Sequence, residues 1–300
     1  MKSVLITGFT GMLGRELTNY FLSQNIDVYG ISRHHSSLLP VEKQLNLNLA
    51  QPEFEHLISE NFNPDLVIHA AAFTDLKYCS LFPSETTQLH VLSSGTLAKR
   101  FRNSKFIYIS TDSVFDGQKG NYIETDTVQP LNLYASSKKE GEDQVLNSNS
   151  NSFILRTNII GFHNPIKSSL FEWAFDALSK GTQINGFSNV YFNPLYCGKY
   201  GNLISGFLNK VPESGIYNFA SSQIISKFDF LVRIAEKMNL DRSLITPIEM
   251  QSGTDGVIRP LNTTLNIEKT SNLGVAFPSM IENIEHMCED FKTFNFSYGI

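Results

Sequence analysis

Near its start the chain reads Ser3-Val4-Leu5-Ile6-Thr7-Gly8-Phe9-Thr10-Gly11-Met12-Leu13-Gly14, a β-rich apolar run followed at once by three glycines. The run predicts a buried strand, and the spacing of Leu13, Leu17 and Phe21 predicts a helix after it. Glycines at this junction allow a tight turn and a close backbone approach, while the first N–H groups of the helix attract anions. The unit is typical of a dinucleotide phosphate loop, although its GxxGxxG spacing also suits a plain structural turn.

Five further short apolar runs in the first half of the chain predict strands, at 27–32, 44–48, 65–69, 105–110 and 153–156. Helix-like stretches separate them, and this alternation indicates βαβ units. We therefore expect an α/β fold with a doubly wound parallel sheet of the Rossmann type and a ligand crevice at the carboxyl ends of its strands. The polar run 147–152 is expected to be a solvated loop.

After about residue 158 the pattern becomes less regular, with clustered aromatic residues and irregular Pro and Gly. We therefore expect two parts in the chain. Residues 1–158 should form a dinucleotide-binding domain, and 159–300 should form mainly a smaller C-terminal substrate-binding lobe. Parts of 190–220 are expected to return to the first domain.

Composition argues against several classes of function. The 300 residues carry a formal net charge of −5 and contain no block of Lys and Arg, which argues against a nucleic-acid binder. No eighteen apolar residues run together, so no membrane span is expected. Cys79, Cys197 and Cys288 form no CxxC pair, and no HExxH occurs, so we predict reduced thiols in a cytoplasmic protein and no metal site.

The second predicted strand, 27–32, bears on the choice of cofactor. In NAD-specific proteins of this fold an acidic side chain about 20 residues after the glycine loop holds the ribose 2′-hydroxyl. Here Asp27 stands at the start of the strand, which is the wrong end, whereas Ser32 and Arg33 stand at its carboxyl end and suit a 2′-phosphate. We therefore predict NADPH in preference to NADH. The alternative is that Arg33 is an ordinary surface residue.

A Tyr-x-x-x-Lys motif occupies Tyr134 to Lys138 in a predicted helix. Residues four apart share a helix face, so the phenol and the ammonium can point into one site. A nearby cation brings the pKa of a tyrosine toward the working range of an acid–base catalyst. A tyrosine and a lysine at this spacing often lie on one helix face without a catalytic role. A glycine loop about 120 residues earlier makes the motif informative about function here.

With both motifs, the chain resembles the extended short-chain dehydrogenase/reductase family, and within it the dTDP-4-dehydrorhamnose reductase branch. The resemblance rests on stretches that occur in the expected order and span nearly the whole chain: Gly8–Gly14, Val67–Ala72, Ser110–Gly117, Pro130–Glu142, Leu155–Thr157 and Arg259–Asn262. It implies the Rossmann-type fold, a nicotinamide cofactor and a nucleotide-linked sugar as substrate.

The resemblance also implies residue roles. Tyr134 matches the proton donor, Lys138 the residue that holds the nicotinamide ribose and tunes the tyrosine, and Thr111 the hydroxyl that orients the substrate carbonyl. Thr111 and Asp112 match positions that touch the sugar, and Ile159 stands near the place of a sugar-flanking Trp in many such reductases. The expected cofactor contacts are Gly8, Thr10, Gly11, Met12, Leu13, Gly14, Ser32, Arg33, Asn48, Leu49, Ala70, Ala71, Ala72, Tyr134 and Lys138.

The chain departs from this branch at a few positions. His90 stands where the helix usually offers an Asn, and the missing Trp near Ile159 leaves the identity of the sugar open. Arg259 suits either a contact with a substrate phosphate or a structural ion pair. The acidic residues that bind Mg²⁺ in some relatives have no secure match, which agrees with the prediction of no metal.

The resemblance implies an NADPH-dependent reductase of a nucleotide-linked 4-keto-6-deoxysugar, acting in the synthesis of cell-surface polysaccharide precursors. Two alternatives stay open. The same branch contains a non-catalytic, NADP-binding regulatory subunit of methionine adenosyltransferase, and the wider family contains nucleotide-sugar epimerases. Dehydration is disfavoured, because Ser113 follows Asp112 where dehydratases carry an acidic pair. A homodimer is compatible with this class of enzyme.

Overall fold

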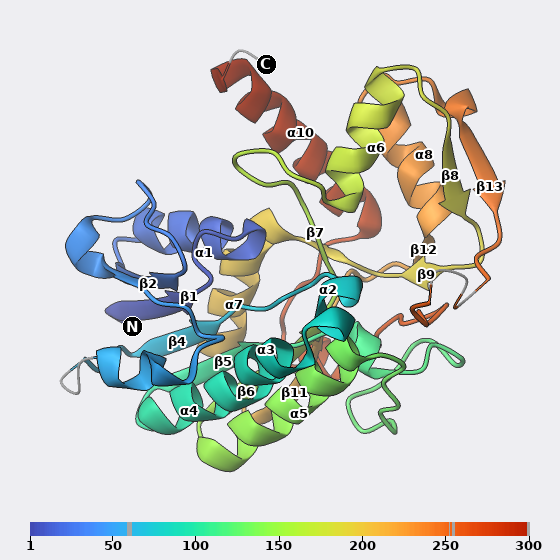
Figure 1. The fold of residues 1–300 in the computed structure, drawn as a ribbon. Coiled ribbons are helices and arrows are strands. Elements are labelled where there is room, and N and C mark those ends of the chain that lie inside the picture. Colours follow the sequence, from blue (N-terminus) through green and yellow to red (C-terminus); the bar gives the residue numbers. More distant parts are fainter. Residues whose placement is uncertain (59–61, 252, 254–255, 299–300) are drawn as a thin grey trace.

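The computed structural model describes residues 1–58, 62–251, 253 and 256–298, with side chains up to Phe294 in the last helix. Its centre is a seven-stranded sheet in the order β11-β6-β5-β4-β1-β2-β3, with every neighbouring pair parallel (Figure 1). The strands are β1 (Ser3–Thr7), β2 (Asp27–Ser32), β3 (Gln44–Asn46), β4 (Leu66–His69), β5 (Lys105–Ile109), β6 (Ser152–Thr157) and β11 (Gly215–Phe219). The predicted doubly wound, Rossmann-type sheet is confirmed, and its strand order reverses between β1 and β4.

All six predicted strands are present, although β3 and β5 end one or two residues earlier than expected. The prediction of a solvated loop over 147–152 is correct only for a short turn with an exposed Ser150 between α5 and β6. Helix α5 continues to Ser148, and Asn149 is buried. The Asn149 amide donates to the carbonyls of Phe101 and Ser104, at 3.0 and 3.4 Å, and these bonds hold the polar turn inside the protein.

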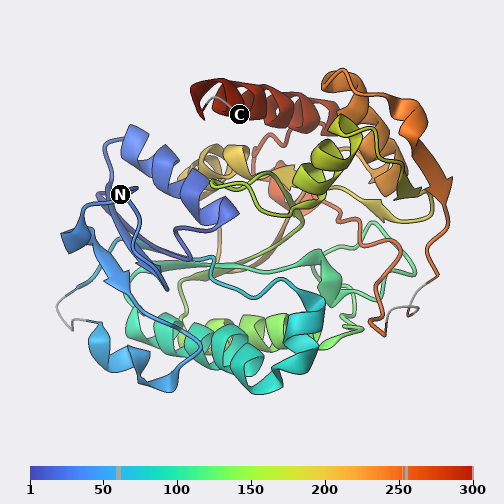
Figure 2. The same cartoon turned by 45° about the horizontal axis from the view of Figure 1, so that its top comes forward.

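Helices cover both faces of the sheet (Figure 2). One face carries α1 (Met12–Ser23) and α7 (Tyr200–Asn209), and the other carries α4 (Ser93–Arg100) and α5 (Leu133–Ser148). Because side chains alternate along a strand, Val4 and Ile6 of β1 pack on the α1 side, whereas Leu5 packs on the α5 side. Both faces of the sheet are therefore buried, as a parallel sheet requires.

A smaller lobe packs beside the α1 face of the sheet. It contains α6 (Leu170–Ser179), α8 (Lys227–Lys237), α10 (Met280–Tyr298), and the strand pairs β7 (Ile159–Ile160) with β10 (Leu195–Tyr196), β9 (Tyr191–Phe192) with β12 (Ile225–Ser226), and β8 (Ile184–Phe187) with β13 (Ile245–Ile248). The remaining short helices are α2 (Leu76–Leu81), α3 (Pro83–Thr87) and α9 (Glu268–Asn272). One apolar cluster runs from the sheet into the lobe. The division into domains at residue 158 therefore stays a prediction.

A buried ion pair fixes α5 to the sheet. Arg156 of β6 donates through Nε and Nη2 to the two carboxylate oxygens of Glu142, at 3.0 and 2.7 Å, and the two side chains are only 2% and 0% exposed. Arg156 Nη1 also donates to the carbonyl of Glu124 (3.2 Å), and the Ser110 hydroxyl donates to Glu142 (2.6 Å). These added bonds and the bidentate geometry compensate for the desolvation of both charges.

Removing the charge of Glu142 should strongly destabilise the protein. The substitution Glu142→Gln keeps the side-chain volume but leaves the Arg156 guanidinium buried without its counter-ion, and we expect a loss of about 3 kcal/mol in the free energy of unfolding. Urea denaturation followed by circular dichroism measures this. The control is Asp143→Ala, which breaks only the exposed pair with Lys139 and should change stability by less than about 1 kcal/mol. Equal stabilities of the two variants would contradict the assignment.

Candidate functional site

The glycine loop between β1 and α1 is shaped by close backbone contacts. Gly8 has a φ of +68°, and a Cβ there would lie 2.9 Å from the Cα of Ala71. A Cβ on Gly14 would lie 2.1 Å from the carbonyl oxygen of Gly8, so only glycine lets the helix approach the loop this closely. Gly11 caps α1, whose first N–H groups have no partner within the helix. This cradle fits the pyrophosphate of a dinucleotide.

A smaller cavity of about 220 Å³ lies beside the glycine loop, at the carboxyl ends of β2 and β4. It brings together the predicted cofactor residues Gly8, Thr10, Gly11, Ser32, Arg33, Asn48, Leu49, Ala70, Ala71 and Ala72. The Arg33 guanidinium lies 5.9 Å from the centre of the Phe73 ring, and none of the described residues that line this cavity is acidic. The Ser32 hydroxyl donates to the carbonyl of His34, so Arg33 is the stronger candidate for a contact with a 2′-phosphate.

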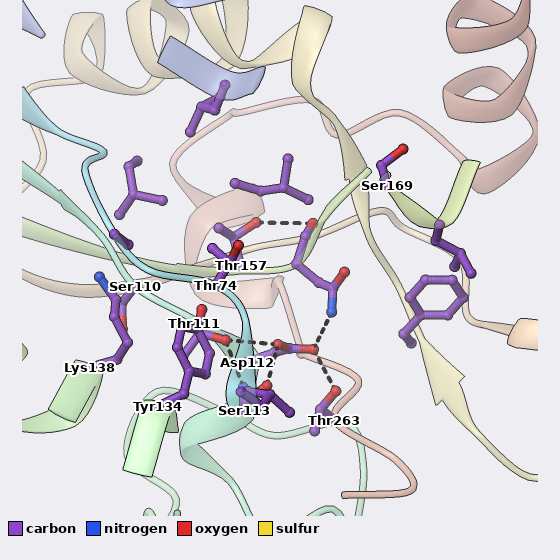
Figure 3. Close-up of a pocket in the computed structure, with 18 of the residues that line it drawn as sticks. Thr74, Ser110, Thr111, Asp112, Ser113, Tyr134, Lys138, Thr157, Ser169 and Thr263 are labelled. Atoms are coloured by element: carbon purple, nitrogen blue, oxygen red, sulfur yellow. Dashed lines mark hydrogen bonds between the residues drawn. The ribbon is translucent and has the colours of Figure 1, made fainter. Parts of the chain in front are cut away.

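The central cavity, of about 620 Å³, shares Gly8, Gly11, Ala70 and Ala72 with the smaller one. Its walls come from the carboxyl ends of the strands, from α5 and from the lobe (Figure 3). The remaining predicted residues line it: Met12, Leu13, Gly14, Thr111, Asp112, Tyr134, Lys138 and Ile159. The fold therefore brings every predicted site residue to one of two adjoining cavities. The ligand atom that each residue contacts stays a prediction.

Tyr134 and Lys138 lie one turn apart near the start of α5, where the Asn132 side chain caps the helix by accepting from the N–H of Ala135. Burial raises the pKa of Tyr134 to about 12, although a hydrogen bond with the Thr111 hydroxyl lowers it in part. Burial lowers the pKa of Lys138 to about 7, against the opposing charge of a nearby carboxylate. The phenol therefore keeps its proton at neutral pH. The expected lowering of the Tyr134 pKa by Lys138 is not found, because burial raises that pKa.

Asp112 is the most connected polar side chain at the edge of the central cavity. Its Oδ1 accepts from the hydroxyls of Thr111 and Ser113, at 3.2 and 3.3 Å. Its Oδ2 accepts from Asn158 Nδ2 (2.8 Å) and from the Thr263 hydroxyl (2.5 Å) (Figure 3). The carboxylate therefore joins the ends of β5 and β6 to a segment of the lobe, and much of its capacity to accept hydrogen bonds is used within the protein. The expected sugar contact stays a prediction.

His90 is fully buried in the π-helical turn Gln88–Leu92, next to Tyr134. Its Nε2 accepts from the N–H of Phe73 (2.9 Å), and its Nδ1 lies 2.9 Å from the Ser137 hydroxyl. Because that hydroxyl donates to the carbonyl of Tyr134, Nδ1 carries the hydrogen. Burial, with the charge of a nearby lysine, lowers the pKa of His90 to about 2, so the ring is neutral. Through these hydrogen bonds the neutral His90 links the chain segment beside both cavities to α5, the helix that carries the predicted catalytic residues.

Two cationic side chains, Lys227 and Arg259, line the central cavity from the lobe. Only Arg259 was identified from the sequence. Lys227 begins α8 and Arg259 belongs to the resembling stretch near the end of the chain. Burial lowers the pKa of Lys227, and the charge of Asp112 opposes this shift. No local pattern marks Lys227, which follows the N-cap Ser226 like any first helical residue. The sequence left two roles open for Arg259, which lines the cavity and also donates to the carbonyl of Val257, and both roles stay predictions.

Comparison with known proteins shows a match over nearly the whole chain. The family model described as RmlD substrate binding domain matches residues 1–293. Methionine adenosyltransferase 2 subunit beta from Bos taurus is 30% identical over 284 residues, covering 91% of this chain and 83% of that protein. The dTDP-4-dehydrorhamnose reductase from Aggregatibacter actinomycetemcomitans is 29% identical over 286 residues, covering 90% of this chain and 92% of that protein.

A solved structure shows the same fold. The dTDP-4-dehydrorhamnose reductase from Bacillus anthracis, in complex with NADP, superposes with a TM-score of 0.84 at 22% sequence identity. The match covers 97% of this chain and 99% of that one. The parallel sheet and the lobe described above therefore belong to one shared architecture.

Adding a methyl group at Gly14 should impair dinucleotide binding. In Gly14→Ala the new Cβ would meet the carbonyl of Gly8, so the loop or the helix must shift, and we expect affinity for NADPH to fall by at least about tenfold. The matched control is Gly206→Ala in α7, where nothing lies within 4 Å of the added Cβ. Fluorescence titration with NADPH measures affinity, and thermal unfolding checks the fold. Unchanged affinity in the Gly14 variant would refute the assigned cradle.

Proposed function

Because the chain belongs to the RmlD substrate binding domain family, we propose that it is an NADPH-dependent reductase of a nucleotide-linked 4-keto-6-deoxysugar. The observation that carries this proposal is the arrangement of Tyr134, Lys138 and Thr111. Their side chains line the same cavity as the glycine loop, so a cofactor held by that loop and a sugar would both reach the phenol. The relatives named dTDP-4-dehydrorhamnose reductase support the substrate class.

The proposed reaction turns a carbonyl group into an alcohol by adding one hydride and one proton. Bound NADPH would supply the hydride to the carbonyl carbon. Tyr134 donates its phenolic proton to the carbonyl oxygen, and the neighbouring Thr111 hydroxyl, with which it shares a hydrogen bond, orients that oxygen. In its protonated form Lys138, one turn further along α5, would stabilise the remaining phenolate, and its pKa of about 7 leaves both of its forms populated at neutral pH.

The charges around the central cavity support an anionic substrate. Lys227 and Arg259 line it from the lobe, and a nucleotide-linked sugar carries a diphosphate between its two halves. Lysine and arginine are the usual side chains for binding such groups. The volume of about 620 Å³ falls within the usual range for small-molecule sites.

A second candidate function rests on a different observation. Several curated relatives, at 28–30% identity, are named methionine adenosyltransferase 2 subunit beta, so a role as a partner subunit is the main alternative. An epimerase of the same family is the other. Oxidation of NADPH in the presence of nucleotide-linked keto sugars distinguishes the three. A reductase consumes the cofactor in proportion to product, an epimerase converts sugar without net consumption, and a partner subunit binds NADPH without turnover.

A cytoplasmic location and a homodimer are further parts of the proposal. Cys79, Cys197 and Cys288 are free and buried, which agrees with a reducing environment. Among the described helices, none is long and apolar enough to cross a membrane. Within the part of the chain that the structure describes, no group of three or more potential ligand side chains could hold a metal ion. Light scattering of the purified protein would test the homodimer.

Removing only the hydroxyl of Tyr134 should abolish most of the activity. The substitution Tyr134→Phe keeps the packing of the ring against His90 but deletes the proton donor, so turnover should fall by about 10²–10⁴-fold. Affinity for NADPH should change little, which a fluorescence titration would measure. A Phe variant that reduces its keto sugar at a near-normal rate would rule out this mechanism.

Neutralising Lys227 should weaken binding of the sugar nucleotide. We expect Lys227→Met to raise KM for the substrate by about tenfold through loss of a charge-assisted contact, while affinity for NADPH stays the same. Lys237→Met, at the other end of α8, is the control, because it breaks only partly exposed pairs with Glu285 and Glu289. If both variants gave the same KM as the unaltered protein, the assigned diphosphate contact would be wrong.

A further inference from the structure

The segment from Gly161 to Ser169, here the 161–169 loop, joins β7 to α6 and extends toward the glycine-loop side of the molecule (Figure 1). It contributes to both cavities. His163, Ser168 and Ser169 line the central cavity, whereas Lys167 lines the smaller one. The loop therefore runs from the predicted reaction centre to the end of the site where the adenosine half of a dinucleotide would lie.

One buried carboxylate determines the shape of this loop. Glu172, in the first turn of α6, accepts through Oε1 from the backbone N–H groups of His163 (2.8 Å) and Lys167 (3.0 Å). Its Oε2 accepts from the N–H of Ser169 (2.6 Å) and lies 2.8 Å from His163 Nδ1. The Ser169 hydroxyl in turn donates to the carbonyl of Gly161 (2.6 Å). The loop is thus fixed at both ends and at Lys167.

The bonds to Glu172 are strong enough to keep it ionised. Burial alone would raise the pKa of this carboxyl, but the N–H groups of Lys167 and His163 and the His163 ring outweigh burial and lower the pKa to about 2. The carboxylate is therefore charged at every physiological pH, and its hold on the loop persists. The backbone of Lys167 keeps its position without a ligand, which reduces the entropic cost of using its side chain in binding.

Lys167 and Arg33 approach the smaller cavity from different parts of the chain. Arg33 comes from the end of β2 in the sheet, and Lys167 comes from the loop in the lobe. None of the described residues that line this cavity is acidic, so two cationic side chains border a space without a carboxylate. A phosphate group is the ligand that such a pair suits, because a lysine ammonium binds it as a point charge and an arginine can bind it through two N–H groups.

We infer that Lys167 is a cofactor-binding residue, which contacts a phosphate of the dinucleotide from the lobe. The inference rests on the proposed function, since it requires that the protein binds NADPH. With this contact the dinucleotide would join the sheet to the lobe. The 2′-phosphate of NADPH and the pyrophosphate common to NADPH and NADH share the required chemistry, and the two cofactors distinguish them.

The experiment compares Lys167→Met with the unaltered protein in fluorescence titrations with NADPH and with NADH. We expect the dissociation constant for NADPH to rise by about tenfold, since a charge-assisted contact is lost but the lysine is exposed. Lys167→Arg should restore most of the affinity. The matched control is Lys180→Met in the same lobe, which removes only an exposed pair with Asp176 and should bind both cofactors normally.

Comparing NADPH with NADH shows which phosphate group Lys167 contacts. Weaker binding of NADPH with unchanged NADH supports a contact with the 2′-phosphate, and Arg33→Ala should then show the same selectivity. An equal loss for both cofactors supports a contact with the pyrophosphate. If Lys167→Met binds both cofactors as tightly as the unaltered protein, the inference is overturned while the proposed function stands. An unaltered protein that binds neither cofactor would contradict the proposed function itself.

Discussion

The buried pair of Glu142 and Arg156 is the interaction on which the site depends most. Glu142 follows Lys138 by one turn of α5, and Arg156 lies near the end of β6, so the pair sets the position of the helix on the sheet. Ser110, which also donates to Glu142, directly precedes Thr111. One carboxylate therefore fixes the helix and two strand ends relative to one another. Burial lowers the pKa of Lys138, and the charge of Glu142 partly opposes this effect.

Two more buried carboxylates have similar roles at other walls of the cavities. Asp112 joins the ends of β5 and β6 to Thr263, and Glu172 gathers the backbone of the 161–169 loop. A carboxylate suits such positions because its two oxygens accept several hydrogen bonds from different directions. The cavities lie between elements that are far apart in sequence. Each of these carboxylates holds several such segments together through its hydrogen bonds. These anions fix the walls of an open site that lies beside the main apolar cluster.

Sequence reasoning succeeded where the structure is decided locally. The close approach of Gly14 to Gly8 lies within a few residues, and the Tyr134 and Lys138 pair depends only on helical spacing. The contribution of Lys167 to a cavity could not be predicted, since it depends on bonds to Glu172 and on how the lobe packs. The same holds for Thr263, which reaches Asp112 across 151 positions of the chain. The incorrect part of the prediction over 147–152 has the same origin, because Asn149 is buried and donates to carbonyls that are distant in the sequence.

The physical cost of the catalytic arrangement bears on the choice between enzyme and partner subunit. Burial that lowers the pKa of Lys138 to about 7 reduces the stability of the folded protein at neutral pH, whereas Tyr134, whose pKa burial raises to about 12, stays protonated in both the folded and the unfolded state. Binding a dinucleotide needs the glycine loop and a few cations, and none of these requires a buried phenol that shares a hydrogen bond with Thr111. Unfavourable burial of titratable groups in a cavity is typical of sites that move protons. The arrangement of Tyr134, Lys138 and Thr111 therefore favours a reductase over a protein that only binds the cofactor.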